Sequence, residues 1–353
     1  MKPMKEIYSD IIQFRGTHYD FGTLQGERLR DSLTLHNRQS SWKIRKPRFR
    51  IDTGEAEAVF RTYAPGIWEE LRGLRDALAL PMEDVLRDFG GYRSEIPRAG
   101  CSTITGEGFI ARNYDFHPNT YEGLYAAFQP TDGGQAVIGP AQRITGRMDG
   151  LNESGLAMAY NFTNRKKPGD GFVCWMVGRI LLETCTNVDE AVRLLHELPH
   201  RGSFSYNLLD KDGRRALAEA GPRGVTIRES PYCSNHFEVQ TGENRHYLKD
   251  SIERLETMES DAAALSDARA AWRLLNDRER GVFADNYKSW AGTIHTSAYF
   301  PETLTAWFAL GGDTEPVAFD FGRWLKGENF ERLTVSGTID TDIGFANIDR
   351  LRG

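Results

Sequence analysis

The chain has 353 residues, a formal net charge of −6 at pH 7 and a pI near 5.8. This acidic balance argues against nucleic acid or an anionic membrane as a general partner, because both favour a basic protein face. The four cysteines lack the short paired spacing and nearby histidines of a zinc site, so we expect neither a metal nor a cofactor. No apolar run suits a signal peptide or a membrane span, which makes a cytoplasmic protein the expectation.

The first hundred residues are expected to be mainly helical. Leu, Phe, Ala and Trp recur at steps of three and four residues over 19–35 and 55–80, which is the spacing of one helix face. Residues 1–100 are therefore interpreted as a helical fragment with buried apolar stripes. No linker rich in Pro, Ser or Gly interrupts the middle of the chain, so this fragment is expected to pack against residues 101–353 as one compact unit.

From residue 101 onward the pattern changes to short alternating strands separated by Gly, Asp and Asn turns. Residues 101–105 and 109–113 flank the turn 105–108 and predict a hairpin. With a four-residue loop, Cys101 would lie directly opposite Arg112, where Cβ atoms are about 5 Å apart. A slip of one residue would turn Arg112 to the other face of the sheet.

Further antiparallel hairpins and two helical blocks are expected downstream. Adjacent antiparallel strands with helices in separate blocks indicate an α+β layered fold. A helical stretch over 172–198 should break near Thr186 and Asn187, and another helix should run over 261–277. The expected hairpins pair 143–148 with 156–161, 203–209 with 215–219, and 293–299 with 304–310.

The junction between Gly100 and Cys101 carries the main chemical hypothesis. Breaking this peptide bond would leave a thiol and a free α-amine on one residue, and an α-amine with a pKa of about 7.7–8.0 can take the proton of the thiol. Gly100 permits the strained backbone needed when a thiol attacks the carbonyl that precedes it. The alternative is that Cys101 is a buried cysteine that acts only as a small apolar side chain.

Several segments resemble the N-terminal nucleophile (Ntn) hydrolases, in the branch of the acyl-CoA:6-aminopenicillanic acid acyltransferases, penicillin V acylases and bile salt hydrolases. The resemblance implies a four-layer αββα sandwich of mainly antiparallel sheets. It also implies self-cleavage at Gly100-Cys101, a catalytic domain over 101–353 and a fragment 1–100 that stays docked. The matching segments are 20–27, Cys101 with Ala-Arg-Asn-Tyr-Asp at 111–115, 149–162 ending in Asn-Phe, Ser-Asn-His at 234–236, and 251–254.

The resemblance also implies roles close to the nucleophile. Arg112 would hold the thiolate or grip the acyl carbonyl of the substrate, and Asp115 would accept a hydrogen bond from the new α-amine. Asn235 would donate to the oxyanion, where the loss of one donor typically costs about 10²–10³ in rate. An ordinary surface ion pair is the alternative for Arg112 and Asp115, and a local turn is the alternative for Asn235.

Three more residues follow from the same resemblance. Asn161 and Tyr160 would line the substrate or oxyanion side of the site, although Asn161 could instead close a strand. Arg254 would be the late catalytic arginine. It lies on an expected helix beside Glu253 and Glu256, so an exposed ion pair is the competing interpretation.

We therefore expect a self-cleaving cysteine hydrolase that acts on linear N-acyl amides through an acyl-enzyme on Cys101. Two alternatives stay open: an acyltransferase that moves an acyl group from acyl-CoA to an amine, and a non-catalytic binding protein that keeps the fold. The expected partner is a small N-acyl amide, with acyl-CoA for the transferase. No nucleic acid or membrane partner is expected, and a homo-oligomer is compatible with the sequence.

Overall fold

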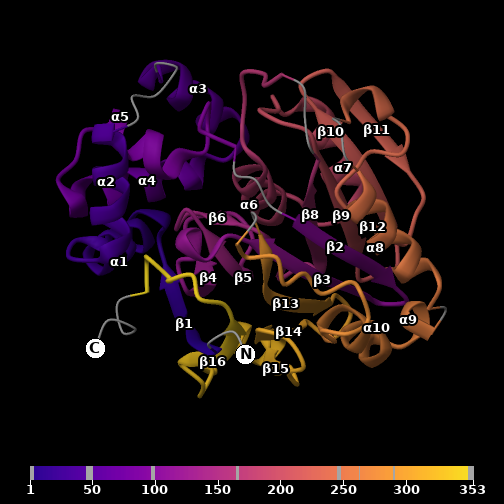
Figure 1. Ribbon diagram of the computed structural model, residues 1–353. Coiled ribbons are helices and arrows are strands. Elements are labelled where there is room, and N and C mark those ends of the chain that lie inside the picture. The colour runs from indigo at the N-terminus through magenta and orange to yellow at the C-terminus, as the bar shows by residue number, and fades with distance from the viewer. Residues whose placement is uncertain are drawn as a thin grey trace.

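Two β-sheets stacked face to face form the middle of the molecule, and helices cover both outer faces (Figure 1). The structure, a computed structural model, describes the backbone over most of the chain and the side chains of the same residues except 41–44. The described ranges are 4–44, 51–96, 100–163, 167–244, 248–261, 263–288 and 291–348.

The larger sheet is antiparallel except where β1, the first strand in the chain, runs parallel to β4. Its order is β11-β10-β9-β8-β7-β5-β4-β1-β16, with the short β6 paired to β5. The strands are β1 (Met4–Gly16), β4 (Leu124–Pro130), β5 (Val137–Gln142), β6 (Gly146–Arg147), β7 (Asp149–Asn152), β8 (Leu156–Phe162), β9 (Phe204–Asp210), β10 (Arg215–Gly221), β11 (Gly224–Arg228) and β16 (Thr334–Asp340).

The smaller sheet is antiparallel throughout and carries the nucleophile candidate on its second strand. Its order is β12-β2-β3-β13-β14-β15, and every residue of β2 and β3 is buried. The strands are β2 (Gly100–Gly106), β3 (Phe109–Phe116), β12 (Tyr232–Cys233), β13 (Gly292–Phe300), β14 (Thr305–Leu310) and β15 (Val317–Asp320).

Helices complete four layers. The outer face of the larger sheet is covered by α6 (Cys174–Thr184) and α7 (Val188–Glu197), while α8 (Lys249–Glu259), α9 (Ala263–Ser266) and α10 (Ala268–Asn276) contact the smaller sheet. Short elements are η2 (Pro118–Thr120), η3 (Thr241–Glu243) and α11 (Phe321–Leu325). The expected αββα class is therefore confirmed. Within the described residues, no helix is both long and apolar enough to cross a membrane.

Local sequence signals explain where the helices on the larger sheet begin and end. The expected break near Thr186 and Asn187 is confirmed, because α7 starts there and the side chain of Asn187 caps it by accepting from the backbone N–H of Glu190. On the other side of the molecule, the single helix expected over 261–277 is divided into α9 and α10 at Asp267, whose side chain caps α10.

The first hundred residues form a helical group on one side of the molecule, but they begin with a strand (Figure 1). Strand β1 lies inside the larger sheet, parallel to β4 and antiparallel to β16. The helical expectation did not include it, because polar residues such as Glu6 and Asp10 interrupt its apolar pattern. The helices are α1 (His18–Leu29), α2 (Leu33–Ile44), α3 (Thr53–Tyr63), α4 (Pro65–Leu78), α5 (Met82–Val85) and η1 (Leu86–Gly90).

The β2–β3 hairpin differs from its expected register. Cys101 pairs with Tyr114, and Thr103 pairs with Arg112, because the turn contains only two residues and Gly108 in it adopts a φ of 76°. The expected four-residue loop is therefore wrong. The shift amounts to two residues, so Arg112 still lies on the same face of the sheet as Cys101, now diagonally across the ladder.

One other expected hairpin is corrected and two are confirmed. The strand that pairs with β8 is β7, not residues 143–148, of which Gly146–Arg147 pairs with β5 instead. Gly155, at a φ of 83°, allows the tight turn between β7 and β8. The hairpins β9–β10 and β13–β14 match their expected positions.

The close approach of α1 and α4 predicts a large effect for one methyl group. A Cβ on Gly22 would lie 1.9 Å from the carbonyl oxygen of Glu70, so Gly22→Ala must push the helices apart. We expect urea unfolding to show that the free energy of unfolding falls by about 1–3 kcal/mol. Gly54→Ala on α3 is the matched control, because its Cβ would meet only ordinary contacts. It should be neutral or stabilising by up to about 1 kcal/mol, and equal losses in both variants would contradict the packing argument.

Candidate active site between the two sheets

Cys101 lies on β2, buried between the two sheets, with polar groups at both its sulfur and its backbone nitrogen. Arg112 donates from Nη2 to the Sγ of Cys101 at 3.0 Å. The backbone N–H of Cys101 donates to Oδ1 of Asn235 at 2.9 Å. The thiol and the backbone nitrogen of this residue are therefore each held by a different side chain.

Arg112 is fixed from several sides. Its Nη1 donates to the carboxylate of Asp149 on β7, and its Nη2 also donates to the backbone carbonyl of Tyr160 at 2.6 Å. The guanidinium lies 4.7 Å from the ring centroid of Tyr114 and 4.9 Å from that of Tyr160. Arg112 and Asp115 are both buried, so they do not form the surface ion pair considered as their alternative.

Asn235 and Arg254 meet beside the backbone of the nucleophile candidate. Asn235 follows β12, and its Oδ1 also accepts from Nη2 of Arg254 at 2.8 Å, while its Nδ2 donates to the carbonyl of Phe162 at 2.7 Å. Arg254 reaches from α8 and donates from Nη1 to the carbonyl of Cys101 at 2.8 Å and to Oγ of Ser102 at 2.7 Å. Arg254 also pairs with Asp250, yet its side chain is buried rather than exposed.

Asp115 lies next to the peptide bond between Gly100 and Cys101. The residue pairs with Gly100 across the hairpin, and a Cβ on Gly100 would lie 2.8 Å from Oδ2 of Asp115, so any larger residue at position 100 would displace this carboxylate. Thr293 donates to Oδ1 of Asp115 at 2.7 Å, and Arg254 lies 3.9 Å from Oδ2. Burial raises the pKa of Asp115, and Arg254 and Thr293 oppose this shift.

Asn161 lies near the residues that surround Cys101, but its side chain forms hydrogen bonds with other residues. Its Oδ1 accepts from Oγ1 of Thr103 at 2.8 Å and from Nδ2 of Asn207 at 2.9 Å. Its Nδ2 donates to the carbonyl of Cys233 at 3.2 Å. The side chain of Asn161 thus links the two sheets at Thr103, two residues along β2 from Cys101. The hydroxyl of Tyr160 likewise bonds to Gln142, so Tyr160 meets Arg112 through its carbonyl and its ring.

The surroundings of the Cys101 sulfur favour the thiol over the thiolate. Burial raises the pKa of Cys101, while the charge of Arg112 and a hydrogen bond from the backbone of Phe162 act in the opposite direction. The thiolate is the nucleophilic form of cysteine, so this environment holds the sulfur in its less reactive state.

Asp149 is the residue that the sequence interpretation did not single out. It lies within the segment 149–162, but the expected hairpin ended at residue 148 and left Asp149 in a turn. Its contacts come from β3 and β13, which are distant in the sequence, so no local pattern marks it.

In the described residues, no group of three or more His, Cys, Asp or Glu side chains is arranged to hold a metal ion.

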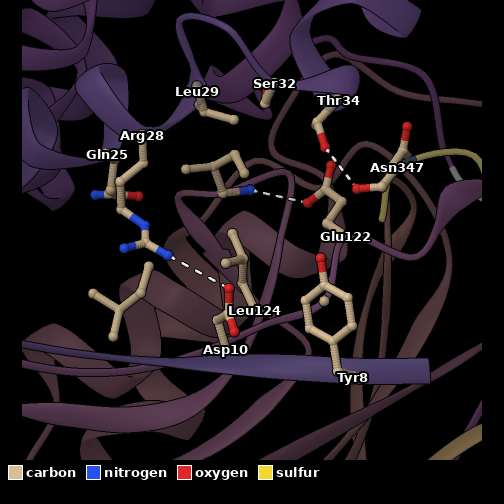
Figure 2. Close-up of a pocket in the computed structure, with 13 residues that line it drawn as sticks. Tyr8, Asp10, Gln25, Arg28, Leu29, Ser32, Thr34, Glu122, Leu124 and Asn347 are labelled. Carbon is tan, nitrogen blue, oxygen red and sulfur yellow. Dashed lines mark hydrogen bonds and ion pairs between the residues drawn. The ribbon is translucent and has the colours of Figure 1, made fainter. Parts of the chain in front are cut away.

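A separate cavity of about 100 Å³ lies between the N-terminal segment and later residues, away from Cys101 (Figure 2). Arg28 points toward Asp10 there, with 3.6 Å between Nη2 and Oδ2, and Oε2 of Glu122 accepts from the backbone N–H of Ile144 at 3.3 Å. The cavity marks a polar contact between segments on either side of residue 100, and it contains none of the residues described around Cys101.

The two stacked sheets, with Cys101 near the start of the inner strand β2, agree with the resemblance to the Ntn hydrolases seen in the sequence. Residues 103–315 match the family model for acyl-coenzyme A:6-aminopenicillanic acid acyl-transferase, and the chain belongs to this family. The protein is therefore of the Ntn amide hydrolase or acyltransferase type. No curated protein matches the sequence.

The solved structures that match the chain include three enzymes of low sequence identity. The penicillin V acylase from Agrobacterium tumefaciens is 13% identical over 63% of this chain and 86% of that chain, with a TM-score of 0.46. A variant of the conjugated bile acid hydrolase from Clostridium perfringens is 13% identical over 67% and 96%, with a TM-score of 0.43. The N-acylethanolamine-hydrolyzing acid amidase ortholog from Caenorhabditis elegans is 11% identical over 57% and 93%, with a TM-score of 0.38.

The contacts of Arg254 predict a marked loss of stability when its charge is removed. Arg254→Gln leaves the carbonyl of Cys101 and the nearby Asp115 without their cationic partner. We expect urea unfolding to give a loss of about 2–3 kcal/mol. Arg269→Gln is the matched control, because Arg269 pairs with Glu315 on the surface and its loss should cost less than about 1 kcal/mol. Similar losses in the two variants would contradict a buried role for Arg254.

Proposed function

We propose that this protein cleaves itself between Gly100 and Cys101 and then acts as a cysteine Ntn hydrolase on linear N-acyl amides. The observation that carries the proposal is the pair of contacts at Cys101. Its sulfur lies 3.0 Å from Arg112, and its backbone nitrogen, which would become the α-amine, lies 2.9 Å from Asn235. A nucleophile and its base would thus be held in one residue.

Self-cleavage begins when the thiol of Cys101 attacks the carbonyl carbon of Gly100. The C–N bond breaks, its nitrogen takes a proton and becomes the α-amine of Cys101, and the acyl group moves to sulfur as a thioester. Water then hydrolyses the thioester, which frees the thiol and leaves a carboxylate at Gly100. Asp115 lies beside this bond and is suited to receive a hydrogen bond from the new amine.

Turnover would use the same sulfur. The α-amine takes the proton of the thiol, the thiolate attacks the carbonyl carbon of an N-acyl amide, and negative charge develops on the carbonyl oxygen. Nδ2 of Asn235 is our candidate donor to this oxyanion, with Asn161 and Tyr160 as neighbours. The leaving amine takes a proton from the α-ammonium group, and water attacks the acyl-enzyme to release the carboxylic acid.

We infer that residues 1–100 remain bound after cleavage to the catalytic domain, residues 101–353. Strand β1 lies between β4 and β16, so removing it would open the larger sheet. Buried polar contacts also cross between the two parts: a hydrogen bond joins His18 and Glu183 at 2.9 Å, and an ion pair joins Glu70 and Arg179 at 2.8 Å. These contacts do not depend on the bond between Gly100 and Cys101.

The acyltransferase reaction is the second candidate, and the family match supports it directly. In that reaction an acyl-CoA thioester would acylate Cys101, and an amine rather than water would accept the acyl group. A non-catalytic binding protein is the third candidate. We also infer a cytoplasmic setting, in agreement with the four cysteines, which are all free and buried.

The self-cleavage proposal predicts two fragments in the purified protein. N-terminal sequencing and intact mass should find a large fragment that begins Cys-Ser-Thr, and Cys101→Ala should yield only the uncut chain, because the attacking sulfur is absent. Cys185→Ala is the matched control, since Cys185 is also buried but its sulfur contacts Thr184, 3.8 Å away, so this variant should leave cleavage complete. An uncut wild-type chain whose Cys101 is inert toward iodoacetamide would favour the binding protein instead.

The nature of the acceptor is tested with a panel of N-acyl amides and acyl-CoA thioesters, each with and without added amine. A hydrolase should release free acid from the amides at a rate that the amine does not change. A transferase should release CoA from the thioester, with formation of the new amide, at least about tenfold faster in the presence of the amine. Thermal stabilisation by CoA itself would also support the transferase.

A further inference from the structure

The buried carboxylate of Asp149 lies on the far side of Arg112 from the nucleophile candidate. Both side chains are completely buried, and Nη1 of Arg112 donates to Oδ2 of Asp149 while Nη2 faces the sulfur of Cys101. Among the described residues, Nε of Arg112 has no hydrogen-bond partner. The direction of the guanidinium is therefore set by Asp149, by the carbonyl of Tyr160 and by the sulfur itself.

Asp149 is in turn held by alternate residues of β13. Ser297 donates from Oγ to Oδ1 of Asp149 at 2.9 Å, Tyr299 donates from its hydroxyl to the same oxygen, and Nε2 of His295 lies 3.5 Å from Oδ2. Side chains alternate along a strand, so residues 295, 297 and 299 share one face. Ser297 pairs with Arg112 across the β3–β13 ladder, which brings this face to the site.

These contacts keep Asp149 ionised in the interior. Burial opposes ionisation, but Arg112, His295 and Tyr299 outweigh it and hold the pKa of Asp149 well below its ordinary value. The charge of Arg112 is therefore already balanced when the sulfur is a neutral thiol. Without Asp149, a thiolate on Cys101 would become the nearest counter-ion of Arg112.

We propose that Asp149 is a positioning residue for the reaction at Cys101: it aims the guanidinium of Arg112 at the sulfur and balances the positive charge of that guanidinium. This inference rests on the proposed role of Cys101 as the nucleophile. Without the carboxylate of Asp149, the guanidinium of Arg112 would lose the partner that orients it toward the sulfur.

Other charged and titratable groups face Cys101, Arg112 and Asp149, and a variant that tests Asp149 must leave them unaltered. From the smaller sheet they are Tyr114, Asp115, His295 and Tyr299; from the larger sheet they are Tyr125, Arg147 and Tyr160. The α-amine of cleaved Cys101 would join them. Asp149→Asn keeps the shape of the side chain and removes only its charge, so it isolates the effect of the carboxylate.

The experiment compares the wild type with Asp149→Asn. Alkylation of Cys101 by iodoacetamide is followed as a function of pH by mass spectrometry of the peptide that contains it. The pH at which alkylation of Cys101 is half-maximal should fall by about one unit, because Arg112 loses its compensating anion. In the same variant kcat for an N-acyl amide should fall at least about tenfold, with KM within about twofold. A merely structural role would lower the melting temperature and leave the midpoint in place.

Two further variants keep the inference testable if Asp149→Asn does not fold. Tyr299→Phe and Ser297→Ala each remove one hydrogen bond to Asp149 and should lower kcat by about threefold to tenfold at constant KM. Thr296→Val is the matched control, because Thr296 faces the other side of β13, where it bonds to Asn113 and Asn276. It should lose stability and keep its kcat.

Three results would overturn the inference. If wild-type Cys101 reacts with iodoacetamide but the pH midpoint of this reaction is unchanged in Asp149→Asn, the inference about Asp149 is overturned and the proposed function is not. The same holds if Tyr299→Phe and Ser297→Ala keep the wild-type kcat, or lose no more of it than Thr296→Val. If Cys101 of the wild type does not react at any pH, the proposed function fails, and the inference fails with it.

Discussion

The structure depends on one buried cation that joins the two sheets. Arg112 belongs to the smaller sheet, its carboxylate partner Asp149 belongs to the larger sheet, and Cys101 lies between the two sheets within reach of the same guanidinium. A buried arginine without a counter-ion is very unfavourable, so the two sheets must stack in a register that supplies one. The stacking that completes the core therefore also places the sulfur among charged and hydrogen-bonding groups.

Most of the fold could be predicted from local patterns. The change from helical spacing to short alternating strands at residue 101 marks the start of β2, and the break at Asn187 follows from the capping preference of asparagine. Strand β1 could not be found in this way, because its pairing partners β4 and β16 come from distant parts of the chain. The hairpin register was misjudged by two residues, since the propensity of a turn does not fix its length.

The residues around Cys101 were found only in part, for the same reason. Arg112 and Asp115 follow Cys101 closely, and one hairpin brings all three together. A register shift of two residues keeps Arg112 on the same face of the sheet as Cys101, whereas a shift of one residue would not. Asn235 and Arg254 are nineteen residues apart, yet α8 lies beside β12 and β2 and carries Arg254 to Asn235. Asp149 has no such local signal, because a carboxylate at the start of a strand is common and only the tertiary structure shows its partners.

Strand β1 lies inside the larger sheet, and this position fixes the order in which folding and the proposed cleavage can occur. A chain cut at residue 100 before it folds would have to recover its inner strand from a separate molecule, at a cost in entropy that grows as the two pieces are diluted. While the backbone is intact, the strand is tethered and its local concentration is high. If the chain cleaves itself as proposed, folding must therefore come first, and the intact peptide link between residues 100 and 101 serves as an assembly aid that is no longer needed once the sheet has closed.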